Sequence, residues 1–161
     1  MAAGPGQPFI KDPDNPIAPG DDPFVALVDG RFIMVHTDTE HRRILWRESE
    51  DGRRFDEPRE ILARRTGTPL AFDSLRVAGP ALVATPTLDD RQHLGLFYAG
   101  ASRNEADEFV EAIGYVGSFD GYSWQRSLDG QPIFAAGPTG AGGPAPLIHA
   151  SRATLFFHQP R

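Results

Sequence analysis

The sequence has no cysteine among its 161 residues. This absence excludes a disulfide framework, a thiolate metal site and a cysteine nucleophile. No apolar run approaches the length of a membrane span. The first residues, 1–8, lack both the basic and the apolar region of a secretion signal. We therefore expect a cytoplasmic protein that does not associate with membranes.

Lysine is almost absent as well, since Lys11 is the single one beside many arginines. This bias is typical of a GC-rich genome, and we expect a bacterial source. The formal net charge is -6, and no basic cluster is longer than two residues. Such a surface argues against nucleic acid or an anionic membrane as a partner, and a neutral or cationic ligand fits it better.

Glycine and proline, in contrast, are abundant. The chain has 17 Gly and 15 Pro, and they fall between the apolar runs, where turns are needed. A hydrophobic content of 40% is enough for one domain with a core. Short apolar runs separated by turn residues favour an all-β fold.

The chain also repeats itself. Residues 22–55 and 79–124 each contain a Pro that opens an apolar strand, a second apolar strand, a third strand ending in Ser-x-Asp-Gly, and an aromatic residue three positions after that Gly. The first two strands recur at 143–148 and 155–158. Repeats of this length built only of strands predict propeller blades.

We divide the single domain, 1–161, as follows: a detached outer strand 12–18, blade one 22–62, blade two 79–134 and half blade three 143–160. The predicted strands are 24–28, 32–36, 44–48 and 59–62, then 81–85, 94–99, 113–117 and 131–134, and finally 146–150 and 154–158. The fold class is therefore all-β, with propeller-type blades of four antiparallel strands and about two and a half blades per chain. A closed propeller needs about four to eight blades, so we expect a homodimer or higher oligomer that closes the ring.

The two Ser-x-Asp-Gly motifs have a structural explanation. Gly accepts a positive φ at a strand reversal, and the Asp side chain bonds to backbone amides of the turn. We therefore interpret Asp51 and Asp120 as turn residues rather than ligands. The acidic stretch 104–111 is either a solvated loop or a short helical turn capped by Asn104.

These motifs resemble a known group of enzymes. The motifs are Asp-Pro, then Asp-Gly before an aromatic strand, then Ser-x-Asp-Gly with the aromatic residue that follows it, together with Phe97-Tyr98-Ala99-Gly100. They are similar to motifs in the five-bladed propellers of glycoside hydrolase family 43 and its relatives in families 32, 62, 68 and 130. The resemblance extends from about Asn15 to His158. It implies a glycoside-hydrolase-like propeller with a carbohydrate ligand.

For the inverting members, the resemblance implies three carboxylates at a central funnel: a base, a tuning Asp and a Glu acid. Asp22, directly before Pro23, stands where the base would stand, with Asp21 beside it. The equivalent places hold Gly79 and Gly143, so two carboxylates are missing. Asp73 could reach the same funnel in support of Asp22. An ion pair with Arg76 offers Asp73 a plainer explanation.

Further polar and aromatic residues complete the candidate binding site. His36 and His158 fall at equivalent places on second strands, and His149 ends a first strand. Without carboxylates at a suitable spacing, these histidines predict polar packing near the funnel rather than a metal site. The sequence predicts no cofactor and no metal. The candidate substrate-binding residues are Asp21, His36, Arg76, Tyr98, His149 and His158.

Two hypotheses follow for the function. In the first, the chain binds carbohydrate, or serves a purely structural role, with catalysis reduced or lost. Trp46, Tyr98, Tyr115 and Trp124 then stack on sugars or on one another. In the second, it is an active glycosidase on a furanoside or other oligosaccharide, with Asp22 as base, Asp73 in support and an acid from another chain. The candidates for that acid are Glu105, Glu108 and Glu111. The two glycines favour the first hypothesis.

Overall fold

The computed structural model describes residues 13, 15–40, 42–86, 92–135, 140–149 and 152–159. These residues form antiparallel sheets and contain no α-helix. The first sheet has the order β1 (Asp21–Val28), β2 (Arg31–Asp38), β3 (Arg43–Ser49) and β4 (Arg59–Ala63). The second has the order β5 (Arg76–Pro86), β6 (Gln92–Arg103), β7 (Phe109–Ser118) and β8 (Gln125–Arg126). A separate hairpin pairs β9 (Gly142–His149) with β10 (Arg152–His158).

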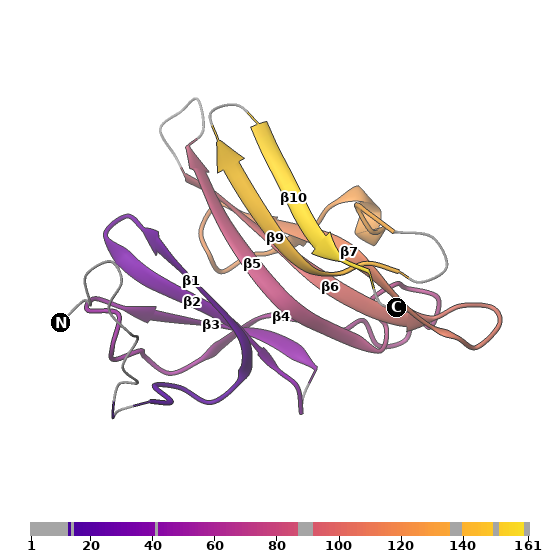
Figure 1. Cartoon of the computed structure of the whole chain (residues 1–161), viewed down its shortest axis with the longest axis horizontal. Helices are drawn as coiled ribbons and strands as arrows, with labels where there is room; N and C mark the ends of the chain where they lie inside the picture. The colour runs from indigo at the N-terminus through magenta and orange to yellow at the C-terminus, as the bar shows by residue number, and fades with distance from the viewer. Residues whose placement is uncertain are drawn as a thin grey trace, which may run out of the picture.

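The sheets are arranged as propeller blades. Their first strands, β1, β5 and β9, follow one another across the molecule, and each sheet then runs outward from its first strand (Figure 1). Two four-stranded blades and the inner half of a third are therefore present. This confirms the all-β, propeller-type architecture that the internal repeat predicts.

Two predicted outer strands differ from the structure. The fourth strand of blade two lies at Gln125–Arg126 rather than at 131–134, where only Phe134 bridges to Ile113 of β7. A 3-10 turn over Leu128–Gly130 separates the two places. Among the described residues of 12–18, no strand forms. Closely spaced prolines remove backbone donors from that segment, which disfavours sheet pairing.

The Ser-x-Asp-Gly turns form as predicted. Asp51 Oδ1 accepts hydrogen bonds from the backbone amides of Arg53 and Arg54, at 2.8 and 2.9 Å, and Ser49 Oγ accepts one from Gly52 at 2.9 Å. These bonds to the charged carboxylate lower the pKa of Asp51 to about 2. The turn at 118–123 repeats the same bonds. The aspartates are therefore satisfied within their own turns.

The acidic stretch after β6 is a hairpin turn and not a helix. Asn104 Oδ1 accepts hydrogen bonds from the amides of Ala106 and Glu108 at 3.0 and 2.9 Å. The side chains of the turn are exposed. The solvated-loop alternative is therefore confirmed.

The main core lies between blades one and two. Alternate residues of β1 to β3 face alternate residues of β5 to β7, so that Val35, Trp46, Leu82, Leu96 and Val116 form one buried cluster. Trp124 packs on Trp46, with 6.0 Å between ring centroids. Burial of this apolar surface is the main favourable contribution to joining the blades.

A charged network lies beside this apolar core. Asp73 is fully buried and accepts hydrogen bonds from Arg65 Nε at 2.5 Å, Arg126 Nε at 3.1 Å and Tyr98 Oη at 2.9 Å. Arg65 follows blade one and also donates to the carbonyl oxygen of Gly130 in blade two. Arg126, in blade two, donates to the carbonyl of Ala63 in blade one. The two arginines therefore cross the interface in opposite directions.

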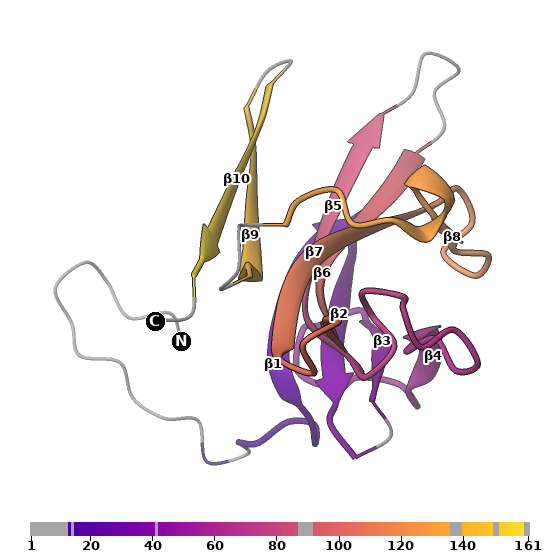
Figure 2. The same cartoon turned by 90° about the vertical axis from the view of Figure 1, so that its right-hand side faces the viewer.

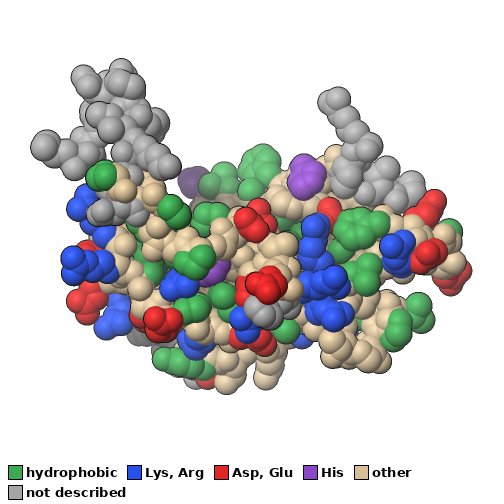
Figure 3. Space-filling view, turned by 90° about the horizontal axis from the view of Figure 1, so that it is seen from below, with side chains coloured by type: hydrophobic (Ala, Val, Ile, Leu, Met, Phe, Trp, Pro, Cys, Tyr) green, Lys and Arg blue, Asp and Glu red, His purple; other side chains and the backbone are tan. Residues whose placement is uncertain are grey.

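The outer surface carries charges of both signs. Basic and acidic side chains alternate over the face seen in Figure 3, without a field of one sign. Within the described ranges, no helix is long and apolar enough to cross a bilayer.

We predict that Asp73→Ala lowers the free energy of unfolding by about 3 to 5 kcal/mol, because it leaves two largely buried guanidinium groups without their counter-charge. Glu50→Ala is the control: that side chain is 87% exposed and lies 3.8 Å from Arg31, so it should cost less than about 0.5 kcal/mol. Urea unfolding measures both. A loss below about 1 kcal/mol for Asp73→Ala would mean that the carboxylate does not hold the blades together.

Candidate functional site

The first strands of the three blades, β1, β5 and β9, share an irregularity at the same position. Asp22, Gly79 and Gly143 each precede a proline, and their φ angles are +49°, +55° and +57°. Each lies within or beside a shift in strand register. The equivalence of these positions, inferred from the sequence, is therefore visible in the backbone.

A chain of hydrogen bonds joins the first position to the second. The buried Thr37 hydroxyl donates to Asp22 Oδ2 at 3.2 Å and accepts from the Gly79 amide at 3.1 Å. Asp21 is bound separately, by Thr39 Oγ1 at 2.5 Å. Asp22 is exposed, so it can present a free oxygen to a ligand while Thr37 fixes its orientation.

The second position lies beside the third. A Cβ added at Gly79 would meet nothing closer than the Gly143 Cα at 3.8 Å and the Pro144 Cδ at 3.9 Å, which is ordinary contact. Gly79 thus has room for a side-chain carbon where the resemblance implies a carboxylate, whereas the ring of His158 already occupies that place beside Gly143. Both positions keep the positive φ of Asp22, so they differ from it in the side chain and not in the backbone.

Charged side chains from other strands surround the third position. A Cβ at Gly142 would lie 2.8 Å from Glu111 Oε2, and one at Gly143 would lie 2.7 Å from His158 Nδ1. Glu111 is nearly buried and accepts a hydrogen bond from Arg76 Nη2. Arg76 Nε, although buried, has no partner among the described residues.

We call this group the axial cluster. It comprises Asp22, Thr37, Arg76, Gly79, Glu111, Gly143 and His158. It offers one exposed carboxylate, a half-exposed guanidinium and an imidazole. This set can accept and donate hydrogen bonds to a polar ligand such as a sugar. Because Glu111 is held in an ion pair by Arg76, it serves as an acceptor and is not placed as a free acid.

Several predicted site residues lie elsewhere. Asp73 and Tyr98 are buried in the inter-blade network and lie outside the axial cluster, so their predicted part in catalysis and ligand binding stays a prediction. The partner of Arg76 is Glu111 and not Asp73. Burial and the Asp73 charge raise the pKa of Tyr98 far above its ordinary value, which keeps its hydroxyl a donor to Asp73.

The three candidates for an acid from another chain lie at different places. Glu111, at the start of β7, reaches the axial cluster within the same chain. Glu108 instead accepts from the Asn104 side chain in the hairpin turn, and Glu105 is exposed there. Sequence reasoning named Glu111 but missed Thr37, for which the only signal was its place beside the predicted second-strand His36.

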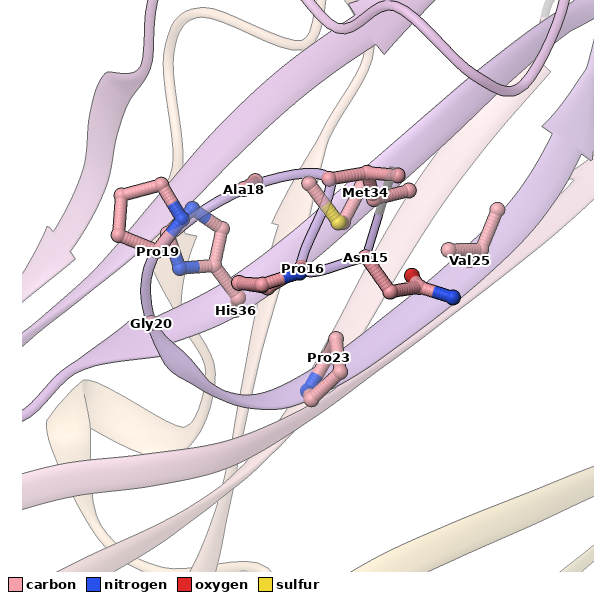
Figure 4. Close-up of a pocket in the computed structure, with 10 residues that line it drawn as sticks. Asn15, Pro16, Ala18, Pro19, Gly20, Pro23, Val25, Met34 and His36 are labelled. Carbon is pink, nitrogen blue, oxygen red and sulfur yellow. The ribbon is translucent and has the colours of Figure 1, made fainter. Parts of the chain in front are cut away.

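His36 belongs to a separate pocket. Its ring is covered by residues 15–20, which pass over β2 and enclose a cavity of about 360 Å³ that Pro23, Val25 and Met34 also line (Figure 4). Gly20 makes this cover possible, because a Cβ there would lie 2.2 Å from His36 Nδ1. Burial, and then the charge of Arg47, which donates to Nε2 at 3.3 Å, lower the pKa of His36.

The other histidine and the aromatics are dispersed. His149 is exposed at the end of β9 opposite Gly142 and Gly143, so it does not join His158. Trp46 and Trp124 pack against each other between the blades, with their ring planes tilted by 57°. Tyr115 lies on the face of blade two that points away from blade one, beside a cleft of about 530 Å³. Throughout the described ranges, no group of three His, Asp or Glu is placed to hold a metal ion.

Comparisons with known proteins support the fold. The alpha-L-arabinofuranosidase from Lactobacillus brevis matches with a TM-score of 0.69 at 15% identity, over 91% of this chain and 46% of its own. The fructofuranosidase from Schwanniomyces occidentalis matches at 0.61 and 17%, over 89% and 28%, and the beta-1,2-mannobiose phosphorylase from Listeria innocua at 0.58 and 19%, over 86% and 41%.

The chain therefore spans less than half of these solved structures and shares their β-propeller fold. At such identities the likeness concerns the fold alone. No protein-family model matches the chain, and no curated protein sequence does.

Two glycines with positive φ provide a test of the room for a side-chain carbon at Gly79. Gly79→Ala and Gly140→Ala share the conformational cost of a left-handed backbone, about 1 kcal/mol. Only Gly140→Ala would also drive a Cβ to 2.5 Å from the Glu111 carbonyl oxygen. We expect Gly140→Ala to lose about 1 to 3 kcal/mol more than Gly79→Ala in urea unfolding. Equal losses would show that the space beside Gly79 is filled.

The lowered pKa of His36 predicts a pH dependence of stability. The unfolded chain takes up this proton near the ordinary pKa of 6.5, whereas the folded chain resists it, so the free energy of unfolding falls as pH falls below that value. His36→Gln keeps a polar side chain but cannot titrate. We expect it to reduce the difference in stability between pH 7.5 and pH 5.5, measured by urea unfolding. The exposed His149→Gln is the control, and an unchanged difference in His36→Gln would contradict the prediction.

Proposed function

We propose that this chain is a carbohydrate-binding propeller in which glycosidase catalysis is reduced or lost, and that the axial cluster is the binding site. The observation that carries the proposal is the composition of the three equivalent positions. One holds Asp22, and the other two hold glycine, which supplies no carboxylate. An inverting hydrolase needs both an acid and a base on opposite sides of the sugar.

The chemistry of the cluster suits a sugar. Asp22 can accept hydrogen bonds from hydroxyl groups, and Arg76 and His158 can donate them. Thr37 holds Asp22 through a buried hydroxyl, so the carboxylate is orientated before a ligand arrives. Preorganised acceptors lose less freedom on binding, which supports recognition by few groups.

A second candidate function is an active glycosidase. It is favoured by the presence of two carboxylates, Asp22 and Glu111, in the axial cluster of a single chain. The contact with Arg76 argues against this function, because it engages an oxygen of the Glu111 carboxyl group that a general acid would direct toward the sugar. The two functions differ in whether ligand is consumed.

The test uses the sugar classes of the structural neighbours as probes: a short arabinofuranoside oligomer, fructose and β-1,2-mannobiose. We predict that at least one binds in calorimetry without being hydrolysed or phosphorolysed. Asp22→Asn should weaken that binding by about tenfold, because it removes an ionised acceptor, while leaving the unfolding free energy nearly unchanged. Asp29→Asn is the matched control, because Asp29 lies just beyond the other end of β1 and has the same φ of +49°.

Each outcome has a definite meaning. Release of product that stops in Asp22→Asn would replace the binding function by the glycosidase. Binding that both variants weaken equally would remove Asp22 from the site. Absence of binding to all three probes would favour a purely structural propeller.

A further inference from the structure

The interface between blades one and two provides a pattern for the uncovered ends of the molecule. On β1, Phe24, Ala26 and Val28 face blade two and pack against its core. On β5, Leu82 faces back toward blade one and is 2% exposed. Each blade thus has a forward face and a backward face, and the forward face of one packs on the backward face of the next.

Blade one has a backward face that is covered over β2 but exposed along β1. Val25 and Leu27 alternate with the packed residues of β1 and are 49% and 65% exposed. Counted from Asp22 and Gly79, Val25 is the equivalent of Leu82 and Leu27 that of Ala84. Residues 15–20 cover Met34 and His36 on this face but leave Leu27 in solvent.

The half blade has an uncovered forward face. Ala145 pairs with Phe156 and Leu147 with Thr154, which places these side chains on one side of the hairpin. Leu155 is on the other side and packs toward blade two. Leu147 and Phe156 are 56% and 57% exposed. The hairpin stands beside the second sheet with this outer side open (Figure 2).

We infer that a second copy of this chain covers both faces: the forward face of β9 and β10 in one copy packs on the backward face of β1 and β2 in its partner. Leu147, four positions after Gly143, corresponds to Ala26, which lies opposite Leu82 and Ala84 at the internal interface. In the partner, Leu147 therefore meets Val25 and Leu27. The dimer repeats a contact that the chain already makes within itself.

A two-fold axis makes this arrangement closed. Each copy contributes one forward and one backward face, so two identical contacts use all four faces. Each copy has three first strands, β1, β5 and β9, so two copies make a ring of six blade positions, within the range of known propellers. The two axial clusters then face a common centre. This inference does not depend on whether the site binds sugar.

The test is the mass in solution by light scattering after size exclusion. The chain should elute at twice 17.6 kDa at micromolar concentration. Leu27→Asp and Leu147→Lys each place a charge in both contacts of a dimer of identical copies, and each should weaken dimerisation by at least about 100-fold. Leu70→Asp, at an exposed loop position away from both faces, should remain a dimer. Circular dichroism confirms that each variant is folded.

Mixing the two variants distinguishes head-to-tail closure from other dimers. A mixed dimer has one contact between unchanged leucines and one contact in which the introduced carboxylate meets the introduced ammonium group. Equal amounts of Leu27→Asp and Leu147→Lys should therefore restore the dimer. A monomeric wild type, a dimeric Leu27→Asp, or a mixture that stays monomeric would each overturn the inference. A dimer held by like faces would survive one variant and would not respond to mixing.

Discussion

The buried carboxylate of Asp73 is the constraint on which the arrangement of the blades depends. A charge without solvent is costly unless it is paired and fully hydrogen-bonded, and here two guanidinium groups and a phenol hydroxyl satisfy it. Arg65 and Arg126 also bind carbonyl oxygens of the opposite blade. The network therefore permits one relative position of the sheets, and this position brings Thr37 of β2 to the Gly79 amide of β5.

Local features of the fold were predictable from the sequence, because their causes lie within a few residues. The Ser-x-Asp-Gly turns and the alternating strands follow from short-range chemistry. The positive φ before Pro23, Pro80 and Pro144 was not predicted, since a residue before proline ordinarily has an extended backbone. The partners of Asp73, Arg76 and Glu111 were not predictable. Each partner lies more than five residues away, and only the packing of whole sheets decides which charge meets which.

The axial cluster shows how glycine lets other strands approach a position that holds a carboxylate elsewhere. At Gly79 and Gly143 the backbone keeps the left-handed conformation that Asp22 adopts, so the loss concerns side chains alone. Beside Gly142 and Gly143, Glu111 of β7 and His158 of β10 come so close that a side chain would not fit without a shift. A cluster assembled in this way keeps polar groups near the axis but does not reproduce the spacing of two free carboxylates on opposite sides of a sugar.

The two open faces are best understood together. Forward and backward faces differ in sequence and shape, so pairing like with like would cover one kind and leave the other in water. Head-to-tail contacts close into a ring only if the rotation from blade to blade sums to a full turn. A two-fold axis needs an even number of blade positions, so a ring of two copies has six, one more than the five-bladed propellers that the sequence resembles. The contact between copies then has to close the ring with a smaller rotation per blade than a five-bladed propeller uses.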